Sequence, residues 1–332
     1  MKTLIIFFLA SFLLFPIEAQ HSRENFFGMW TISIEDGTVG WLNVHKDKGY
    51  LDAELLWVGG SVTPVSNVYF RDDNKLIVTR SNERTIKQGE VVRKFMNNQV
   101  LCFSIENDSI KGVSFLPQQD GMSVKETKFI GWKLPKPTTP PDLSKVVFGN
   151  PIKLFNGVDL SGWELIDPKQ TNGFKVEDGI LVNDPVQNKE SHISYGNIRT
   201  INEFEDFNLK LEVSVPEGSN SGIYLRGLYE IQVLDSYGRE LDSHNMGAVY
   251  SRITPSMPAE KPAGEWQVLD ITLYKRHVTV RLNGKEIISN KPVLGPTGGA
   301  ISADVDKAGP IYLQGDHGKV MYRNIVLTPI LK

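Results

Sequence analysis

The sequence contains a single cysteine, Cys102, in 332 residues. An intramolecular disulfide is therefore excluded, and the stability of the chain must come from large apolar cores. Cys102 stands in the apolar run VLCFSI, a setting typical of a buried small hydrophobe rather than of a reactive thiol.

An excess of positive charge is also missing. The chain has 36 Lys and Arg against 39 Asp and Glu, which gives a formal net charge of −3. Such a chain has no basic field to hold a phosphate backbone, so nucleic acid is not an expected partner.

Long hydrophobic runs are absent beyond the N-terminus, so no membrane span is predicted there. The first residues combine Lys2, an apolar run over residues 4–15, Pro16 and Ala19, which is typical of a secretory signal peptide over residues 1–19. An uncleaved N-terminal anchor is the alternative. No cysteine stands at the cleavage point, so a lipid anchor is not predicted. We expect a secreted or periplasmic protein that does not contact a membrane once the signal is cleaved.

The proline-rich stretch LPKPTTPP at 134–141 separates two strand-rich regions and predicts a stiff linker over residues 135–145. Residues 25–134 open with Gly28 and Trp30, similar to the Gly-x-Trp start of lipocalin-like barrels, and predict a small lipocalin-like barrel or meander. Residues 146–332 contain short alternating runs between turn residues, the pattern of an all-β sandwich or jelly roll.

The segment SNSGIYLRGLYEIQVLDS at 219–236 carries the strongest functional signal. Its aliphatic residues alternate with polar ones, so two strands would each turn aliphatics to the core and polar groups to the opposite face. The predicted polar face holds Tyr224, Arg226, Glu230 and Gln232. The alternative is an ordinary solvated face with a cross-strand Arg226–Glu230 pair.

A second polar cluster lies in the run YLQGDHG at 312–318. If Leu313 faces the core, Tyr312 and Gln314 face the other surface of the sheet. Asp316 and His317 follow between glycines, where a strand end exposes catalytic groups, although both residue types also form turns. His317 is a candidate acid, base or metal ligand.

Five ordered blocks of the C-terminal region, including FNGVDLSGWE, GFKVEDGIL and PIYLQGDHGKVMYRNI, resemble the 3-keto-disaccharide hydrolase family. The resemblance implies a concanavalin A-like jelly roll whose concave face holds a sugar. It also implies an exported glycan-degrading enzyme that cleaves 3-keto-glycosides. A separate sugar 3-oxidoreductase would produce these substrates. The reaction that the resemblance implies is C2 proton abstraction, elimination at C1 and addition of water, with net hydrolysis.

That chemistry requires a base near C2, a group that stabilises the ketone oxygen, and an acid for the leaving oxygen. We expect Glu230, His317 and Arg226 to be catalytic. The predicted substrate-binding residues are Tyr224, Gln232, Tyr312, Gln314, Asp316 and Asp235. No cofactor is firmly predicted, but His192, Glu230 and His317 could hold a divalent metal. A non-catalytic, lectin-like carbohydrate-binding protein on the same jelly roll is the alternative function, and a structural module is a third.

Overall fold

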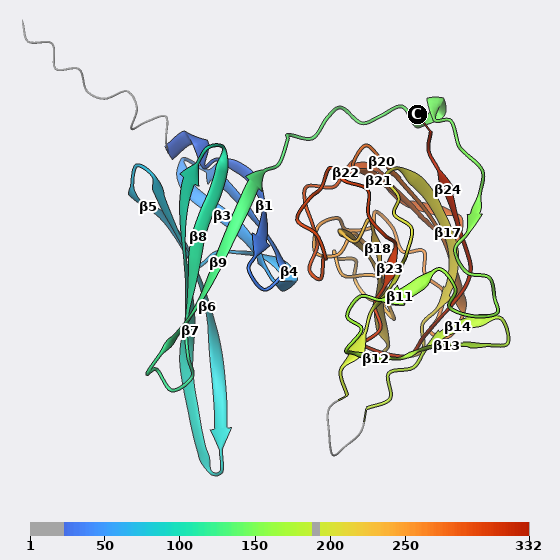
Figure 1. Ribbon diagram of the computed structural model, residues 1–332, viewed down its shortest axis with the longest axis horizontal. Coiled ribbons are helices and arrows are strands. Elements are labelled where there is room, and N and C mark those ends of the chain that lie inside the picture. Colours follow the sequence, from blue (N-terminus) through green and yellow to red (C-terminus); the bar gives the residue numbers. More distant parts are fainter. Residues whose placement is uncertain (1–22, 188–192, 332) are drawn as a thin grey trace, which may run out of the picture.

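The structure is a computed structural model that describes residues 23–187 and 193–331. Two β-sheet parts follow one another along the chain and are joined by an extended segment (Figure 1). The predicted signal peptide lies outside the described residues. Within the described ranges, no helix combines the length and the apolar character that a membrane crossing needs.

The N-terminal part is an antiparallel meander. Its strands, in the part of the chain that the structure describes, are β1 (Gly28–Ile34), β2 (Val39–Asp47), β3 (Tyr50–Trp57), β4 (Gly59–Pro64), β5 (Asn67–Asp72), β6 (Lys75–Gln88), β7 (Val91–Glu106), β8 (Ser109–Pro117) and β9 (Val124–Lys133). They form one sheet in the order β4-β3-β2-β1-β9-β8-β7-β6-β5. The expected small all-β fold is confirmed, and the sheet packs around a core that includes Trp30.

This sheet is apolar on both faces near β2 and β3. Leu42 and Leu55 belong to the core of the N-terminal part. Trp41 and Leu56, one residue away in each strand, belong to the core of the C-terminal part. Since neighbouring residues of a strand point to opposite faces, the period-two pattern gives this sheet one face for its own core and one for docking.

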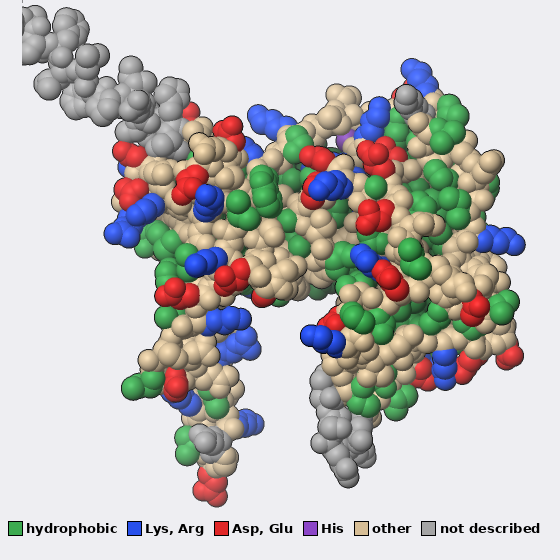
Figure 2. Space-filling view, viewed as in Figure 1, with side chains coloured by type: hydrophobic (Ala, Val, Ile, Leu, Met, Phe, Trp, Pro, Cys, Tyr) green, Lys and Arg blue, Asp and Glu red, His purple; other side chains and the backbone are tan. Residues whose placement is uncertain are grey.

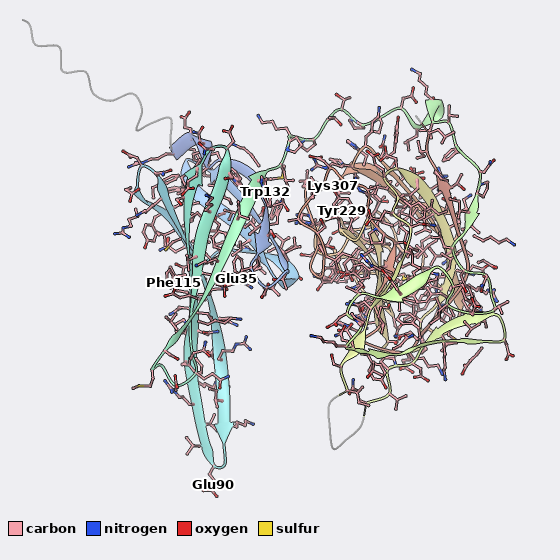
Figure 3. The ribbon with its side chains drawn as sticks, in the orientation of Figure 1. Glu35, Glu90, Phe115, Trp132, Tyr229 and Lys307 are labelled. Carbon is pink, nitrogen blue, oxygen red and sulfur yellow. The ribbon has the colours of Figure 1, made fainter. Side chains whose placement is uncertain are left out.

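The hairpin of β6 and β7 projects away from this contact, with Glu90 at its tip (Figure 3). An open notch separates the hairpin from the C-terminal part in the space-filling view (Figure 2). The two parts therefore touch at β1–β4 and at the C-terminal end of β9, and the hairpin of β6 and β7 diverges from the C-terminal part in this view.

The C-terminal part begins after the short helix η1 (Leu143–Lys145) and is built from two main sheets. Among the described residues, the larger sheet has the order β13-β14-β24-β17-β20-β21-β22, with β10 (Ile152–Lys153) paired to β24. Its other strands are β13 (Phe174–Glu177), β14 (Ile180–Asn183), β17 (Phe207–Ser214), β20 (Trp266–Tyr274), β21 (His277–Leu282), β22 (Lys285–Pro292) and β24 (Val320–Pro329).

The smaller sheet carries the predicted functional segments. Its order, again among the described residues, is β11 (Trp163–Leu165), β16 (Ile198–Thr200), β23 (Tyr312–Leu313), β18 (Asn220–Leu225) and β19 (Tyr229–Leu234). A parallel pair, β12 (Thr171–Asn172) and β15 (Tyr195–Gly196), stands beside it.

Aliphatic residues of the smaller sheet fill the space between the two main sheets. Ile223 and Leu225 of β18 and Ile231 and Val233 of β19 all lie in the C-terminal core. The predicted alternation of this hairpin is therefore confirmed, and the C-terminal part is the expected concanavalin A-like jelly roll.

The two parts dock through a small set of specific contacts. The Trp41 indole Nε1 donates to the carbonyl of Leu294 at 2.9 Å, and the Arg252 guanidinium lies over the Trp41 ring at 4.3 Å from its centroid. Burial lowers the pKa of Arg252 to about 9. Ser61 Oγ lies 2.8 Å from His244 Nε2.

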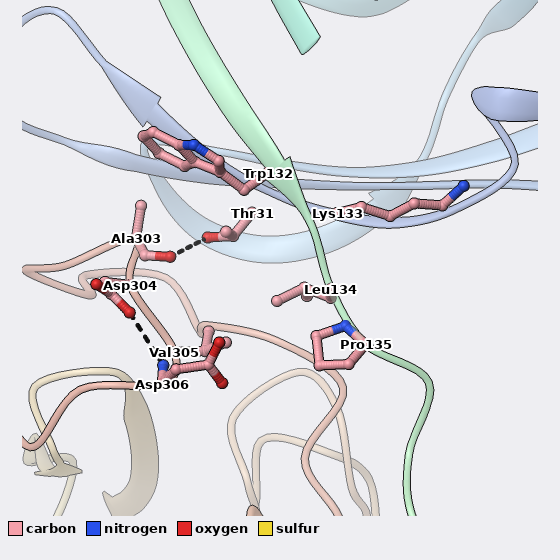
Figure 4. A pocket seen from close by; sticks show the side chains of 9 residues that line it. All are labelled: Thr31, Trp132, Lys133, Leu134, Pro135, Ala303, Asp304, Val305 and Asp306. Atoms are coloured by element: carbon pink, nitrogen blue, oxygen red, sulfur yellow. Dashed lines mark hydrogen bonds between the residues drawn. The ribbon is translucent and has the colours of Figure 1, made fainter. Parts of the chain in front are cut away.

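A second contact lines an interdomain cavity of about 300 Å³ (Figure 4). Here Thr31 Oγ1 donates to the carbonyl of Ala303 at 2.8 Å. The end of β9 and the start of the linker form one wall of this cavity, and residues 303–306 form the other. Hydrogen bonds and an aromatic anchor together give the docking a defined orientation.

We predict that Trp41→Ala lowers the free energy of unfolding by about 3–5 kcal/mol, because it removes a buried indole that contacts both parts. Tyr69→Ala is the matched control, since Tyr69 is 48% exposed on β5 of the same sheet and belongs neither to the lining of the interdomain cavity nor to the docking contacts, and should cost about 1 kcal/mol or less. Urea unfolding of the full chain measures both. Equal losses in the two variants would contradict the assigned docking contact.

Candidate active site

Glu230 is a buried carboxyl in the middle of β19 and is only 4% exposed. It faces away from the apolar core, because its strand neighbours Tyr229 and Ile231 both point into that core. Burial raises the pKa of Glu230 from 4.5 to about 8, a rise opposed by the hydrogen bond from Tyr224 and the charge of His317. Near neutral pH this group can both accept and release a proton.

Tyr224 stands directly across the hairpin from Glu230. Its hydroxyl lies 2.8 Å from Glu230 Oε2 and 2.8 Å from the carbonyl of Gly298. A phenol has one proton to donate. When Glu230 is ionised, Tyr224 donates to the carboxylate. When Glu230 is protonated, the acid can donate to the phenol oxygen while the phenol donates to Gly298, so this arrangement serves both protonation states.

The phenol is held by a second ring. Tyr312 of β23 stacks on Tyr224 with ring centroids 3.8 Å apart and an interplanar angle of 13°, and its hydroxyl donates to the carbonyl of Gly299 at 2.6 Å. Burial raises the pKa of both tyrosines well above 10. Both remain neutral phenols at physiological pH and act as hydrogen-bonding groups.

Gly222 provides the space that the Glu230 carboxyl occupies. A Cβ at this position would lie 2.6 Å from Glu230 Oε1. The nearest atom is the end of a side chain rather than backbone, so the clash would be relieved by moving the carboxyl.

Asp316 and His317 form a hydrogen-bonded pair with His317 Nδ1 2.6 Å from Asp316 Oδ1. This hydrogen bond is the main cause that raises the pKa of His317, against the effect of burial. Burial acts to raise the pKa of Asp316, but the hydrogen bond and charge of His317 outweigh it and the net shift is downward. With Nδ1 occupied, the imidazole Nε2 is left for a ligand.

Tyr224, Glu230 and His317 border a pocket of about 240 Å³. Its lining residues are Gly59, Gly60, Asn220, Tyr224, Glu230, Gln232, Tyr250, Gly298, Gly299, Gln314 and His317. Within the part of the chain that the structure describes, the buried amide oxygens of Asn220 and Gln314 have no hydrogen-bond partner. Because buried polar groups are normally paired, these two amides indicate a polar ligand such as a sugar.

Of the predicted catalytic and substrate-binding residues, five line the pocket: Tyr224, Glu230, Gln232, Gln314 and His317. Tyr312 and Asp316 lie outside the lining but contact Tyr224 and His317, respectively.

The structure places the remaining two, Arg226 and Asp235, elsewhere. Arg226 follows the end of β18 with φ of 57°, and its guanidinium donates to the backbone carbonyls of Val305 and Lys307. It does not line the described pocket, so its expected place beside Glu230 is wrong: the strand ends before it and the turn directs it elsewhere. Asp235 accepts from the backbone N–H of Gly218 at 2.9 Å and also lies outside the pocket lining.

Of the three predicted metal ligands, His192, Glu230 and His317, the structure describes two. Glu230 and His317 both line the pocket, whereas His192 lies outside the described residues. Within the described ranges, no group of three His, Cys, Asp or Glu side chains is placed to hold a metal ion.

Several lining residues were not predicted. Asn220 lies two residues before Gly222 and four before Tyr224, so the same alternation could have identified it. Tyr250 carries no such local pattern, although its backbone N–H donates to the carbonyl of Glu230 at 3.0 Å. Gly59 and Gly60 come from the other part of the protein, and no local pattern could have indicated them.

The sandwich and its pocket define a jelly-roll protein of the glycoside-active class. Residues 150–328, more than half of the chain, match the family described as a 3-keto-alpha-glucoside-1,2-lyase-like domain, and the chain belongs to that family. The expected resemblance is thereby confirmed. No curated protein matches the chain.

Solved structures with a similar fold include two candidate glycosyl hydrolases from Parabacteroides distasonis. One is 21% identical with a TM-score of 0.44 and covers 54% of this chain and 93% of its own. The other is 24% identical with a TM-score of 0.40 and covers 54% and 98%. A third is a non-specific endo-beta-1,3(4)-glucanase, 11% identical with a TM-score of 0.36, covering 58% and 93%.

The raised pKa of Glu230 predicts a pH-dependent stability. Its folded-state pKa of about 8 exceeds its reference value of 4.5, so the contribution is present at low pH and is lost as pH rises toward 8. We expect the free energy of unfolding of Glu230→Gln, relative to the unaltered protein, to rise by about 4 kcal/mol between pH 5 and pH 9. Urea unfolding at both pH values measures this. A difference that does not change with pH would contradict the burial of a titrating carboxyl.

Proposed function

We propose that the protein cleaves 3-keto-glycosides by removing the C2 proton, eliminating the C1 substituent and adding water to the product. The observation that carries this proposal is the buried Glu230 carboxyl, with a pKa of about 8, facing a pocket that also contains an imidazole. A ketone at C3 acidifies the C2 hydrogen, and a carboxylate of raised basicity is suited to abstract it.

Glu230 is the proposed base. The C2–H electron pair becomes the enolate, the C1–O bond breaks, and the released oxygen takes a proton. Asp316 and His317 are suited to supply that proton, since the carboxylate orients the ring and favours its protonated form. Water then adds its hydroxyl to C1 and a proton to C2, which gives net hydrolysis.

The developing enolate needs hydrogen-bond donors at the C3 oxygen. The side-chain NH2 groups of Asn220 and Gln314, which border the same pocket as the base, can donate to this oxygen. Their unpartnered amide oxygens can accept hydrogen bonds from sugar hydroxyl groups. Tyr224 keeps a hydrogen bond to Glu230 throughout and thus positions the carboxyl rather than the sugar.

The setting of this reaction is part of the proposal. The segment over residues 1–19 supports export to the periplasm or beyond. A substrate with a C3 ketone requires a separate oxidoreductase that oxidises the sugar first. The lectin-like alternative predicts sugar binding without turnover.

We predict that Glu230→Gln reduces kcat on a methyl 3-ketoglucoside by about 10²–10⁴-fold, because the amide cannot accept the C2 proton. Aglycone release measures this loss. Asp235→Asn is the control. It removes a carboxylate just after the end of β19, outside the pocket lining, and its kcat should stay within about twofold of that of the unaltered enzyme. Undiminished turnover by Glu230→Gln would refute the assigned base, and binding of sugars without any turnover would favour the lectin-like function.

A second prediction concerns the space beside the base. Gly222→Ala should displace the Glu230 carboxyl and lower kcat/KM by about 10–100-fold while the protein stays folded. Gly149→Ala is the matched control, since its added methyl would contact the Leu331 side chain and the Pro329 carbonyl oxygen, neither of which belongs to the pocket lining. Kinetics and thermal unfolding of both variants provide the measurement. Equal kinetics in the two variants would show that the carboxyl position is unimportant.

A further inference from the structure

The bend between β3 and β4 brings the N-terminal sheet to the pocket. Gly59 and Gly60 line the same cavity as Glu230, although they belong to a different sheet. Val58, which precedes them, has φ of 70°. A β-branched residue in this conformation is strained by about 1–3 kcal/mol, so the shape of this bend is maintained by its surroundings.

Close backbone contact joins this bend to the buried carboxyl. A Cβ at Gly298 would lie 2.2 Å from the carbonyl oxygen of Gly60, so the two backbones touch. The carbonyl of Gly298 in turn accepts from Tyr224, which bonds to Glu230. Backbone contact and hydrogen bonds thus run from the N-terminal sheet to the proposed base.

The residues after the bend are fixed to the jelly roll. Ser61 Oγ lies 2.8 Å from His244 Nε2, and the backbone N–H of Val62 donates to Ser251 Oγ at 2.8 Å. Tyr250, between these two contacts, lines the pocket itself. Ser61 and Val62 of β4 are therefore held by the loop over residues 244–251, which borders the pocket.

The segments that carry the bend's contact and the imidazole approach different positions along β18. Gly318, next to His317, packs against Ser219 and Asn220, whereas Gly299, next to Gly298, packs against the Tyr224 hydroxyl. Residues 220 and 224 are separated by about 13 Å along an extended strand. His317 is 43% exposed at its side chain, so the His317 side of the pocket is open to solvent.

We propose that residues 59–61 of the N-terminal sheet close one end of the sugar pocket and restrict the substrate to a single terminal 3-keto sugar ring. This inference rests on the proposed function for the identity of the sugar. A pocket of about 240 Å³ lies below the range of about 300–1,000 Å³ typical of larger ligands. One ring lies between the bend and His317, and the substituent on C1 extends past His317 to solvent.

Gly59 provides the test. An added Cβ there meets no atom within 4 Å, and its φ lies outside the left-handed range, so a larger side chain fits the backbone without strain. In the Glu230→Gln background of the full chain, Gly59→Phe should weaken binding of methyl 3-ketoglucoside by at least about tenfold, by obstructing the pocket. Asp47→Phe is the control. It adds the same ring to the same sheet at an exposed position, at the end of β2 that is farther from the bend, and should leave the Kd within about twofold. Isothermal titration measures these affinities.

An unchanged Kd in Gly59→Phe would overturn the inference. So would cleavage by the unaltered enzyme of 3-keto residues inside a chain as fast as at its end. If the enzyme turns over methyl 3-ketoglucoside and Gly59→Phe has the same kcat/KM, the inference fails and the proposed function stands. If no 3-keto sugar is cleaved but unoxidised methyl glucoside binds and Gly59→Phe weakens that binding, the proposed function fails and the closed end of the pocket stands.

Discussion

The burial of one carboxyl is the constraint on which the site depends. A carboxylate loses hydration when it leaves water, so Glu230 remains in place only because neighbouring groups satisfy it. Tyr224 supplies a hydrogen bond and Gly222 leaves the necessary space. Above the normal pKa of a glutamate, burial of the ionised carboxylate lowers the stability of the folded protein. The same free energy raises the pKa of Glu230 and so makes it a stronger base near neutral pH.

Such burial needs cover that the smaller sheet alone does not provide. The polar face of β18 and β19 is covered by the loops that carry Tyr250 and Gly298, and Gly60 packs on the second of these. The N-terminal sheet can contribute because β2 and β3 are apolar on both faces, with Trp41 and Leu56 available for docking. Because β2 and β3 are apolar on both faces, the N-terminal sheet can dock on the jelly roll. This docking in turn helps to cover the polar pocket around Glu230.

Much of this arrangement can be predicted from local pattern. Period-two alternation is enough to assign the core and polar faces of β18 and β19, and therefore to place Tyr224, Glu230 and Gln232 together. The same rule fails for Arg226, because alternation holds only while the strand continues and this residue lies in the turn. Gly59 and Gly60 could not be predicted, since their role depends on how two separately patterned sheets meet.

Exposure differs sharply between the two proposed catalytic groups, and the difference suits the order of the reaction. Glu230 is enclosed, so in the proposed reaction the C2 proton would be removed where water competes least. His317 is partly exposed, so the released alcohol can leave and water can enter from its side. In the proposed reaction the unsaturated sugar stays against the closed end of the pocket, while the released alcohol leaves and water enters at the open end. On this proposal, a wall built from the N-terminal sheet would favour hydrolysis, because it would retain the intermediate until water arrives.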